Sequence, residues 1–144
     1  MKKSVQIGLL SLGGVLIFSV LSPLALSQSF GGNGKSYRLK TQFTGKSKCL
    51  DIVNDGKNNR LTMANCGNYS GQAWEIVKDG NGYRLRTQFT GQNKCLDIVN
   101  DGKNNRVTMA DCGNYSGQFW EIAKDENGYR LRTQFTGKNK CLDI

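Results

Sequence analysis

Three aspartates stand in the same short motif at equal intervals along the chain. Asp51, Asp97 and Asp143 each follow a Cys-Leu pair, and 46 residues separate each from the next. Carboxylates that recur in identical surroundings favour repeated binding over catalysis, which needs an acid and a base brought together. The sequence contains no histidine, so a histidine-based nucleophile or proton relay is excluded. We therefore expect a binding protein without enzymatic activity or a cofactor.

These aspartates belong to a long internal repeat. The first copy covers residues 37–82 and the second covers residues 83–128, and the two are identical at 38 of 46 positions. Residues 129–144 begin a third copy that matches the second at 15 of 16 positions. Copies this similar should fold alike and bind alike. A site in one copy is therefore expected in the next.

The repeat has the pattern of short β-strands separated by turns. No window carries a long helical period, whereas residues 37–43 alternate apolar and polar side chains as a half-buried strand does. Asn54-Asp55-Gly56 and the glycine-rich stretches elsewhere in the copy are strong turn signals. Four strands per copy are expected, over residues 37–43, 49–53, 60–64 and 73–77 of the first. A closed all-β architecture would protect their edges.

The cysteines recur with the repeat. Cys49 and Cys66 are 17 residues apart, as are Cys95 and Cys112. The simplest pairing is one disulfide in each copy, which leaves Cys141 over. Zinc is the alternative, but the sequence has no Cys-x-x-Cys motif and no histidine. If residues 51–62 are read as a calcium loop, Val53 and Thr62 stand at positions three and twelve, where side-chain carboxylates are expected, so no metal site is expected.

The first 27 residues have the composition of a secretory signal peptide. Lys2 and Lys3 give a basic start, residues 5–20 form an apolar run, and small residues precede Gln28. A membrane anchor is the alternative, but the run is short for a span. We expect cleavage after Ser27, export to the extracellular space or periplasm, no membrane span after cleavage, and a flexible lead-in over residues 28–36.

The chain is basic, with 20 Lys and Arg against 11 Asp and Glu. Such an excess can indicate a nucleic-acid or anionic glycan partner. Here the basic residues are spread evenly through the repeats, in runs no longer than two, and the chain has an export signal. A nucleic-acid partner is therefore not expected, although a weak preference for anionic surfaces stays open.

The spacing of these motifs resembles the ricin-type lectins. Cys49-Leu50-Asp51 followed by Gly71-Gln72-Ala73-Trp74, and the same pattern from Cys95 to Trp120, is similar to the lobes of that family. The resemblance implies a β-trefoil over residues 37–144, in which each repeat forms one four-stranded lobe. It also implies carbohydrate binding, with the aspartate of each Cys-Leu-Asp motif accepting hydrogen bonds from sugar hydroxyls.

Other residues of the repeat complete the expected sugar site. In the family, the Gln and Trp of the Gln-x-Trp motif mainly support the lobe. The turn before them carries an amide and an aromatic ring, the kind of pair that a sugar needs, although a tyrosine that only packs the turn is the alternative. The candidate carbohydrate-binding residues are Asp51, Asn68, Tyr69, Gln72, Asp97, Asn114, Tyr115, Gln118 and Asp143.

The sequence departs from the galactose-binding pattern at two places in each copy. Ala64 and Ala110 stand where such lobes usually carry an aromatic residue, two positions before the second cysteine. Gly71 and Gly117 stand before the Gln, where asparagine is common. Galactose specificity is therefore not implied, and the sugar is left unassigned.

The third copy is expected to be a truncated lobe that stops as its second strand begins. A fragment of a longer protein, a shortened gene, or completion by another chain would each explain this, and we favour a fragment. Completion by another chain, or Cys141, would give an oligomer. The leading function is a secreted, multivalent lectin. The alternatives are a protein-binding trefoil, such as an inhibitor or toxin accessory module, and the targeting module of a larger secreted hydrolase.

Overall fold

A computed structural model describes residues 34–143, and the fold is all-β. The signal peptide and most of the lead-in expected from the sequence lie outside the described residues. Two short 3₁₀ turns, η1 (Ser70–Gln72) and η2 (Ser116–Gln118), each precede a strand. The strands are β1 (Lys48–Ile52), β2 (Leu61–Asn65), β3 (Trp74–Asp79), β4 (Gly82–Thr87), β5 (Lys94–Ile98), β6 (Val107–Asp111), β7 (Trp120–Asp125) and β8 (Gly128–Thr133).

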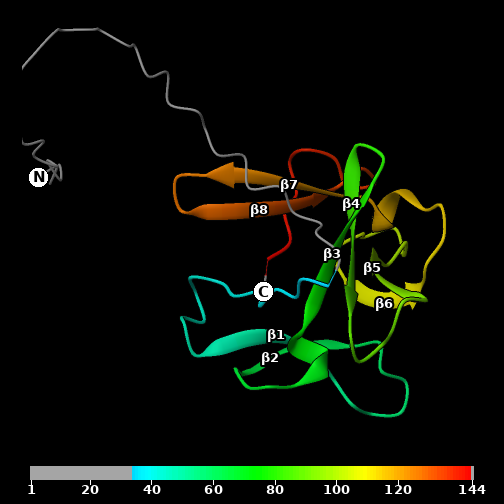
Figure 1. Ribbon diagram of the computed structural model, residues 1–144. Helices are drawn as coiled ribbons and strands as arrows, with labels where there is room; N and C mark the ends of the chain where they lie inside the picture. The colour runs from blue at the N-terminus through cyan, green and yellow to red at the C-terminus, as the bar shows by residue number, and fades with distance from the viewer. Residues whose placement is uncertain (1–33, 144) are drawn as a thin grey trace, which may run out of the picture.

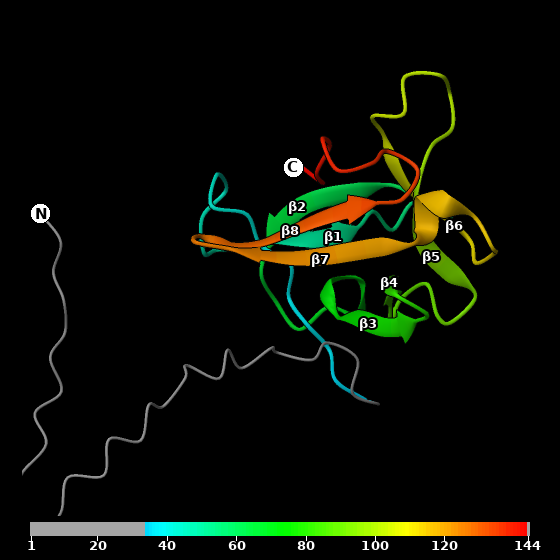
Figure 2. The same ribbon diagram turned by 90° about the horizontal axis from the view of Figure 1, so that it is seen from above.

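The strands pair as antiparallel hairpins, and the hairpins alternate between two kinds. β1 pairs with β2 and β5 pairs with β6, each within one repeat. β3 pairs with β4 and β7 pairs with β8, so these hairpins span the boundary between repeats. A pairing of Tyr83 with Trp120 joins the two boundary hairpins into one four-stranded sheet. Figures 1 and 2 show the β5–β6 hairpin beside β4, at the opposite side of the molecule from the β7–β8 turn.

Disulfides close the hairpins that lie within the repeats. Cys49 bonds to Cys66 and Cys95 bonds to Cys112, which confirms the expected pairing. Each bridge ties the first strand of its hairpin to the residue that follows the second strand. Cys141 is a free, exposed thiol.

The expected strand over residues 37–43 is wrong for the first repeat. The structure has only an isolated bridge there, in which Tyr37 and Trp74 exchange two backbone hydrogen bonds of 2.8 and 3.0 Å. The equivalent segments of the later repeats are strands β4 and β8, because β3 and β7 precede them and pair with them along six residues. Among the described residues, no such strand precedes Tyr37.

The core is built around the two tryptophans of the Gln-x-Trp motifs. Trp74 and Trp120 are fully buried, and each indole N–H donates a 2.9 Å hydrogen bond, to the carbonyl of Leu50 and of Leu96. These bonds satisfy the only polar atom of each indole inside an apolar cluster. Each tryptophan therefore holds the strand that carries an aspartate of the site, since Leu50 and Leu96 directly precede Asp51 and Asp97.

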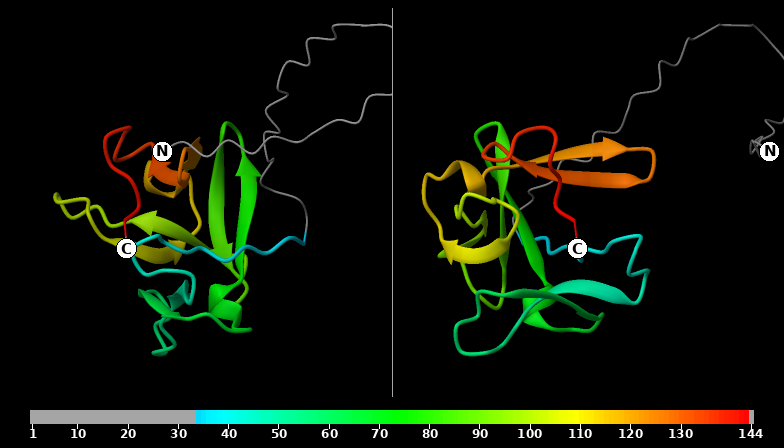
Figure 3. Two further views of the ribbon diagram at one scale, coloured as in Figure 1. Left: turned by 90° about the vertical axis from the view of Figure 1, so that its left-hand side faces the viewer. Right: turned by 180° about the vertical axis from the view of Figure 1, so that it is seen from behind.

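The described start of the third repeat lies against the start of the first. Figure 3 shows residues 134–143 running back toward residues 34–47, between the β1–β2 and β7–β8 hairpins. The amide of Leu142 donates to the carbonyl of Leu131 at 2.8 Å, as Leu50 does to Leu39 at 2.9 Å. No strand follows β8 among the described residues, so the expected second strand from Cys141 is not formed there.

Candidate carbohydrate-binding site

Asp51 is a half-buried carboxylate near the end of β1. Its Oδ1 accepts the backbone N–H of Ile52 at 2.8 Å, and its Oδ2 accepts the Nε2 amide of Gln72 at 2.9 Å. A carboxylate offers about four acceptor positions, so two of them stay available to a ligand. The two bonds from the protein fix the direction in which the remaining positions point.

Gln72 is the residue that holds this carboxylate in place. Its side chain is fully buried, and besides Asp51 it donates to the carbonyl of Asn65 at 2.9 Å. Its Oε1 accepts the backbone N–H of Gly67 at 2.9 Å. The amide is thus satisfied on both ends by protein groups. The structure places Gln72 behind the aspartate, between the β1–β2 hairpin and the turn that follows it.

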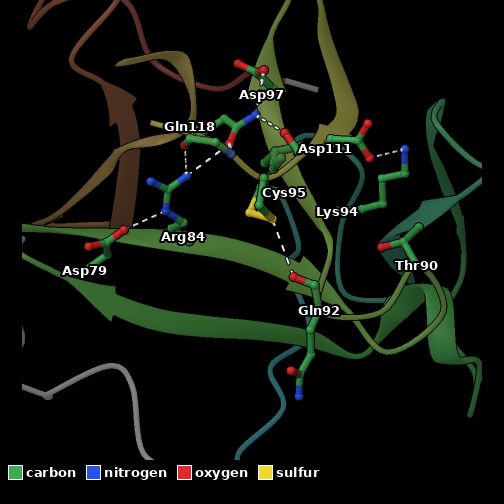
Figure 4. The surroundings of a disulfide bond; sticks show 12 residues. Asp79, Arg84, Thr90, Gln92, Lys94, Cys95, Asp97, Asp111 and Gln118 are labelled. Carbon is green, nitrogen blue, oxygen red and sulfur yellow. Dashed lines mark hydrogen bonds and ion pairs between the residues drawn. A yellow bond between two sulfur atoms is a disulfide. The ribbon is translucent and has the colours of Figure 1, made fainter. Parts of the chain in front are cut away.

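The second repeat reproduces this arrangement (Figure 4). Gln118 Nε2 donates to Asp97 Oδ2 and to the Asp111 carbonyl, each at 2.9 Å, and Gln118 Oε1 accepts the N–H of Gly113 at 2.9 Å. Gln118 is also fully buried. The same pair of side chains therefore occurs twice, 46 residues apart, with the same distances.

Glycine leaves room for each of these carboxylates. A Cβ on Gly71 would overlap Asp51 Oδ1 and lie 3.2 Å from the backbone nitrogen of Ile52. A Cβ on Gly117 would lie 2.5 Å from Asp97 Oδ1. The glycines that depart from the common asparagine of the family therefore have a steric cause here, because the aspartate occupies the space that a side chain would need.

Each carboxylate lies in a surface depression that two repeats line together. The first depression has a volume of about 340 Å³ and includes Asp51, Asn54, Asn68 and Tyr69 from the first repeat with Phe89 from the second. The backbone N–H of Phe89 donates to the carbonyl of Ser70 at 3.3 Å, which attaches the second repeat to η1. Phe89 thus contributes a part of the lining that the first repeat does not supply.

The second depression is similar but smaller. Its volume is about 260 Å³, and it includes Asp97, Asn100 and Phe135, the last from the third repeat. Sequence reasoning missed the four residues Asn54, Asn100, Phe89 and Phe135. A signal was present for the aromatic pair, because a phenylalanine recurs at positions 43, 89 and 135 with the period of the repeat.

The two expected tyrosines lie at the rim and are partly open to solvent. Tyr69 and Tyr115 are 61% and 62% exposed. Each ring rests on a glycine two residues earlier, because a Cβ on Gly67 or Gly113 would overlap the ring. One side of each ring packs on the turn, in line with the interpretation that these tyrosines pack the turn. The rest of each ring is exposed to solvent, as a contact with a sugar would require. Asn68 and Asn114 are exposed beside them, but only Asn68 and Tyr69 line a depression.

Asp143 is placed differently from the other two aspartates. It is exposed and lines a separate depression between residues 38–43 and the third repeat. The described part of the third repeat includes no glutamine that corresponds to Gln72. Among the described residues, the Asp–Gln pair occurs in the first two repeats.

The turn that follows Asn54 is organised by a second aspartate. Asp55 Oδ1 accepts the N–H groups of Lys57 and Asn58, and Oδ2 accepts Arg60 Nε at 2.9 Å. The Asn58 amide and the Arg60 guanidinium hold the pKa of the Asp55 carboxyl below its usual value near 3.8. Asp101 repeats these contacts and this lowered pKa in the second repeat.

Within residues 34–143, no group of three or more His, Cys, Asp or Glu side chains is close enough together to hold a metal ion. No helix in this part of the chain is long and apolar enough to cross a membrane.

Comparison with known proteins identifies one family. The family described as "Ricin-type beta-trefoil lectin domain" matches residues 35–144. No curated protein matches the chain. The matched residues include both Asp–Gln pairs and both disulfides.

Proposed function

The chain belongs to the ricin-type β-trefoil lectin family, and on this premise we propose that it is a secreted, non-catalytic carbohydrate-binding protein with one sugar site in each of its first two repeats. The observation that carries the proposal is the Asp–Gln pair, which occurs with equal 2.9 Å distances in both repeats. Export is part of the proposal, supported by the residue pattern of positions 1–27 and by the two disulfides.

Recognition would rest on the acceptor positions of Asp51 and Asp97 that the protein leaves open. An ionised carboxylate accepts charge-assisted hydrogen bonds, which are about twice as strong as neutral ones. Two adjacent hydroxyl groups of one sugar ring can donate to the two oxygens of one carboxylate. Gln72 and Gln118 would hold the carboxylates in the orientation that this contact needs, without touching the sugar themselves.

The apolar face of a sugar ring would meet the aromatic wall of each depression. Phe89 lines the first and Phe135 lines the second. Each is half-buried and comes from the repeat that follows the one carrying the carboxylate. These rings offer the apolar surface that Ala64 and Ala110 do not. Tyr69 and the amides of Asn54 and Asn68 would add contacts at the first site.

The test is binding of the purified chain to an array of immobilised mono- and oligosaccharides, beside the variant Asp51→Asn/Asp97→Asn. Asparagine keeps the shape of the side chain but removes the charge, so we expect the variant to fold and to lose at least about tenfold in affinity. A parent chain that binds no sugar on the array, or a double variant that binds like the parent, would overturn the proposal.

A further inference from the structure

The two sugar sites differ in what lies behind the glutamine. In the second repeat, Arg84 of β4 is buried, with 8% of its surface exposed, and reaches Gln118. Its NH1 donates to Gln118 Oε1 at 3.0 Å and to the Gly113 carbonyl at 2.6 Å. Its Nε donates to Asp79 Oδ2 at 2.6 Å. Figure 4 shows the continuous series from Asp79 through Arg84 and Gln118 to Asp97.

Arg38 occupies the corresponding position for the first repeat but has fewer hydrogen bonds to the residues that the structure describes. It is exposed, and its NH2 donates to the Gly67 carbonyl at 2.8 Å. The Gln72 Oε1 has a hydrogen bond from Gly67 N–H and none from Arg38 among the described contacts. The first repeat thus has the arginine but lacks the bond to the glutamine.

One of the eight differences between the copies bears on this. Phe119 lies with its ring 4.3 Å from the Arg84 guanidinium carbon, and the first repeat has Ala73 at that position. The position of Asp79 corresponds to Asn33, which lies outside the described residues. An aromatic face and a carboxylate both favour a guanidinium, so together they hold Arg84 in place.

A charged donor on the carbonyl end of an amide strengthens the bonds that its N–H groups donate. Hydrogen bonds in series polarise one another, and the effect is larger where water is excluded, as it is around the fully buried Gln118. The bond from Gln118 to Asp97 should therefore be firmer than the bond from Gln72 to Asp51, although the two distances are the same.

We infer that Arg84 is a positioning residue for Asp97, and that the second repeat is the tighter of the two proposed sugar sites. This inference rests on the proposed function for its consequence in sugar binding. The positioning itself is a property of the free protein and is measured without a sugar.

The first experiment measures hydrogen exchange of the Gln72 and Gln118 side-chain amides by NMR in the full exported chain. In the parent, Gln118 should exchange about twofold to tenfold more slowly than Gln72, the range that one net hydrogen bond produces. The variant Arg84→Gln should bring Gln118 to the rate of Gln72. The matched control Arg38→Gln should leave both rates unchanged.

A second variant keeps the test decisive if Arg84→Gln does not fold. Asp79→Asn/Phe119→Ala replaces the two neighbours of Arg84 with the residue types found 46 positions earlier, those of Asn33 and Ala73. It should accelerate exchange at Gln118 alone. Arg84→Lys, which keeps the charge but loses the fork of donors, should give an intermediate rate. Equal exchange of the two glutamines in the parent would overturn the inference.

Free galactose, mannose, glucose and N-acetylglucosamine are then titrated while the amides of Gly71 and Gly117 report each site separately. For any sugar that shifts these amide signals, the affinity of the second site of the parent should be about twofold to tenfold higher than that of the first site. Arg84→Gln should remove that difference without affecting the first site. Equal affinities with unequal exchange would overturn the consequence for binding. Absence of all sugar shifts would count against the proposed function, while the exchange rates still decide the role of Arg84.

Discussion

Gly71 and Gly117 each lack the Cβ that would overlap the neighbouring aspartate, so each leaves room for the carboxylate beside it. We predict that Gly71→Ala displaces Asp51 and weakens the first site at least about tenfold, because charged hydrogen bonds to the sugar are lost. Gly117→Ala should do the same to the second site. Titration with a free sugar that the parent binds, followed by NMR at each repeat, measures the two effects separately.

The control for this prediction is Ser47→Ala, an exposed position just before β1 whose side chain does not enter either depression. It should leave both affinities and the melting temperature unchanged. If Gly71→Ala bound the sugar like the parent, the carboxylate would tolerate displacement, and its fixed orientation would not matter for recognition.

We expect the Asp55 and Asp101 turns to make the hairpins sensitive to acid. The pKa of each carboxyl is lower in the folded chain than its usual value near 3.8. Their stabilising contribution is therefore complete above about pH 5 and is lost as the pH falls through the folded value. We predict that the urea midpoint drops below pH 4 and that the drop is smaller in Asp55→Asn/Asp101→Asn, which is also less stable at pH 7.

Glu126→Gln, at an exposed position of the β7–β8 turn, is the control for this acid effect and should keep the parent's pH profile. An unchanged profile in Asp55→Asn/Asp101→Asn would mean that other carboxylates, such as Asp125 with its own lowered pKa, dominate the acid response.

The sequence predicted the strands well where both partners lie in the same stretch of chain. The strands expected over residues 49–53, 60–64 and 73–77 are observed as β1, β2 and β3, shifted by one or two residues. The strand expected over residues 37–43 was wrong. Its side chains alternate as in a strand, but within residues 34–143 no strand precedes it to pair with. Alternation of side chains describes a face, whereas a strand also needs a neighbour to pair with.

The same limit applies to the site. The aspartates and glutamines were found because they are close in the motif, and the pairing of Asp51 with Gln72 follows from their places in one hairpin and its turn. Phe89 and Phe135 were missed because they enter from the following repeat, and only the folded chain brings them to Ser70 and Ser116. Arg84 was missed because it lies 34 residues before Gln118, and only the folded chain brings the two side chains together.

Two sites in one folded unit should bind a sugar-coated surface far more tightly than free sugar. A single shallow site buries few atoms and is weak, whereas a second contact on the same surface is intramolecular and can raise avidity by about 10²–10⁴. We predict that Asp51→Asn and Asp97→Asn each abolish most of this gain. The intact site of each variant should keep its affinity for free sugar.

Surface plasmon resonance on a glycan-coated chip and calorimetry with free sugar measure the two quantities. The unequal sites add a ranking, because Asp97→Asn should leave the weaker site and so bind the surface less than Asp51→Asn does. If either single variant bound the surface like the parent, only one repeat would be active and the other would be structural.

The two disulfides also bear on how reliably the chain oxidises. Cys49 and Cys66 are 17 residues apart, whereas Cys66 and Cys95, in near-identical surroundings, are 29 apart. Loop-closure entropy favours the shorter loop by only about twofold, so chain statistics alone would let many molecules cross-link the wrong repeats. The antiparallel register of β1 and β2, which sets Cys49 opposite Ala64, must bring the correct thiols together before the bond closes. Correct oxidation of this chain therefore depends on forming each small hairpin first, and an oxidant that acts faster than the hairpins form should trap cross-linked repeats.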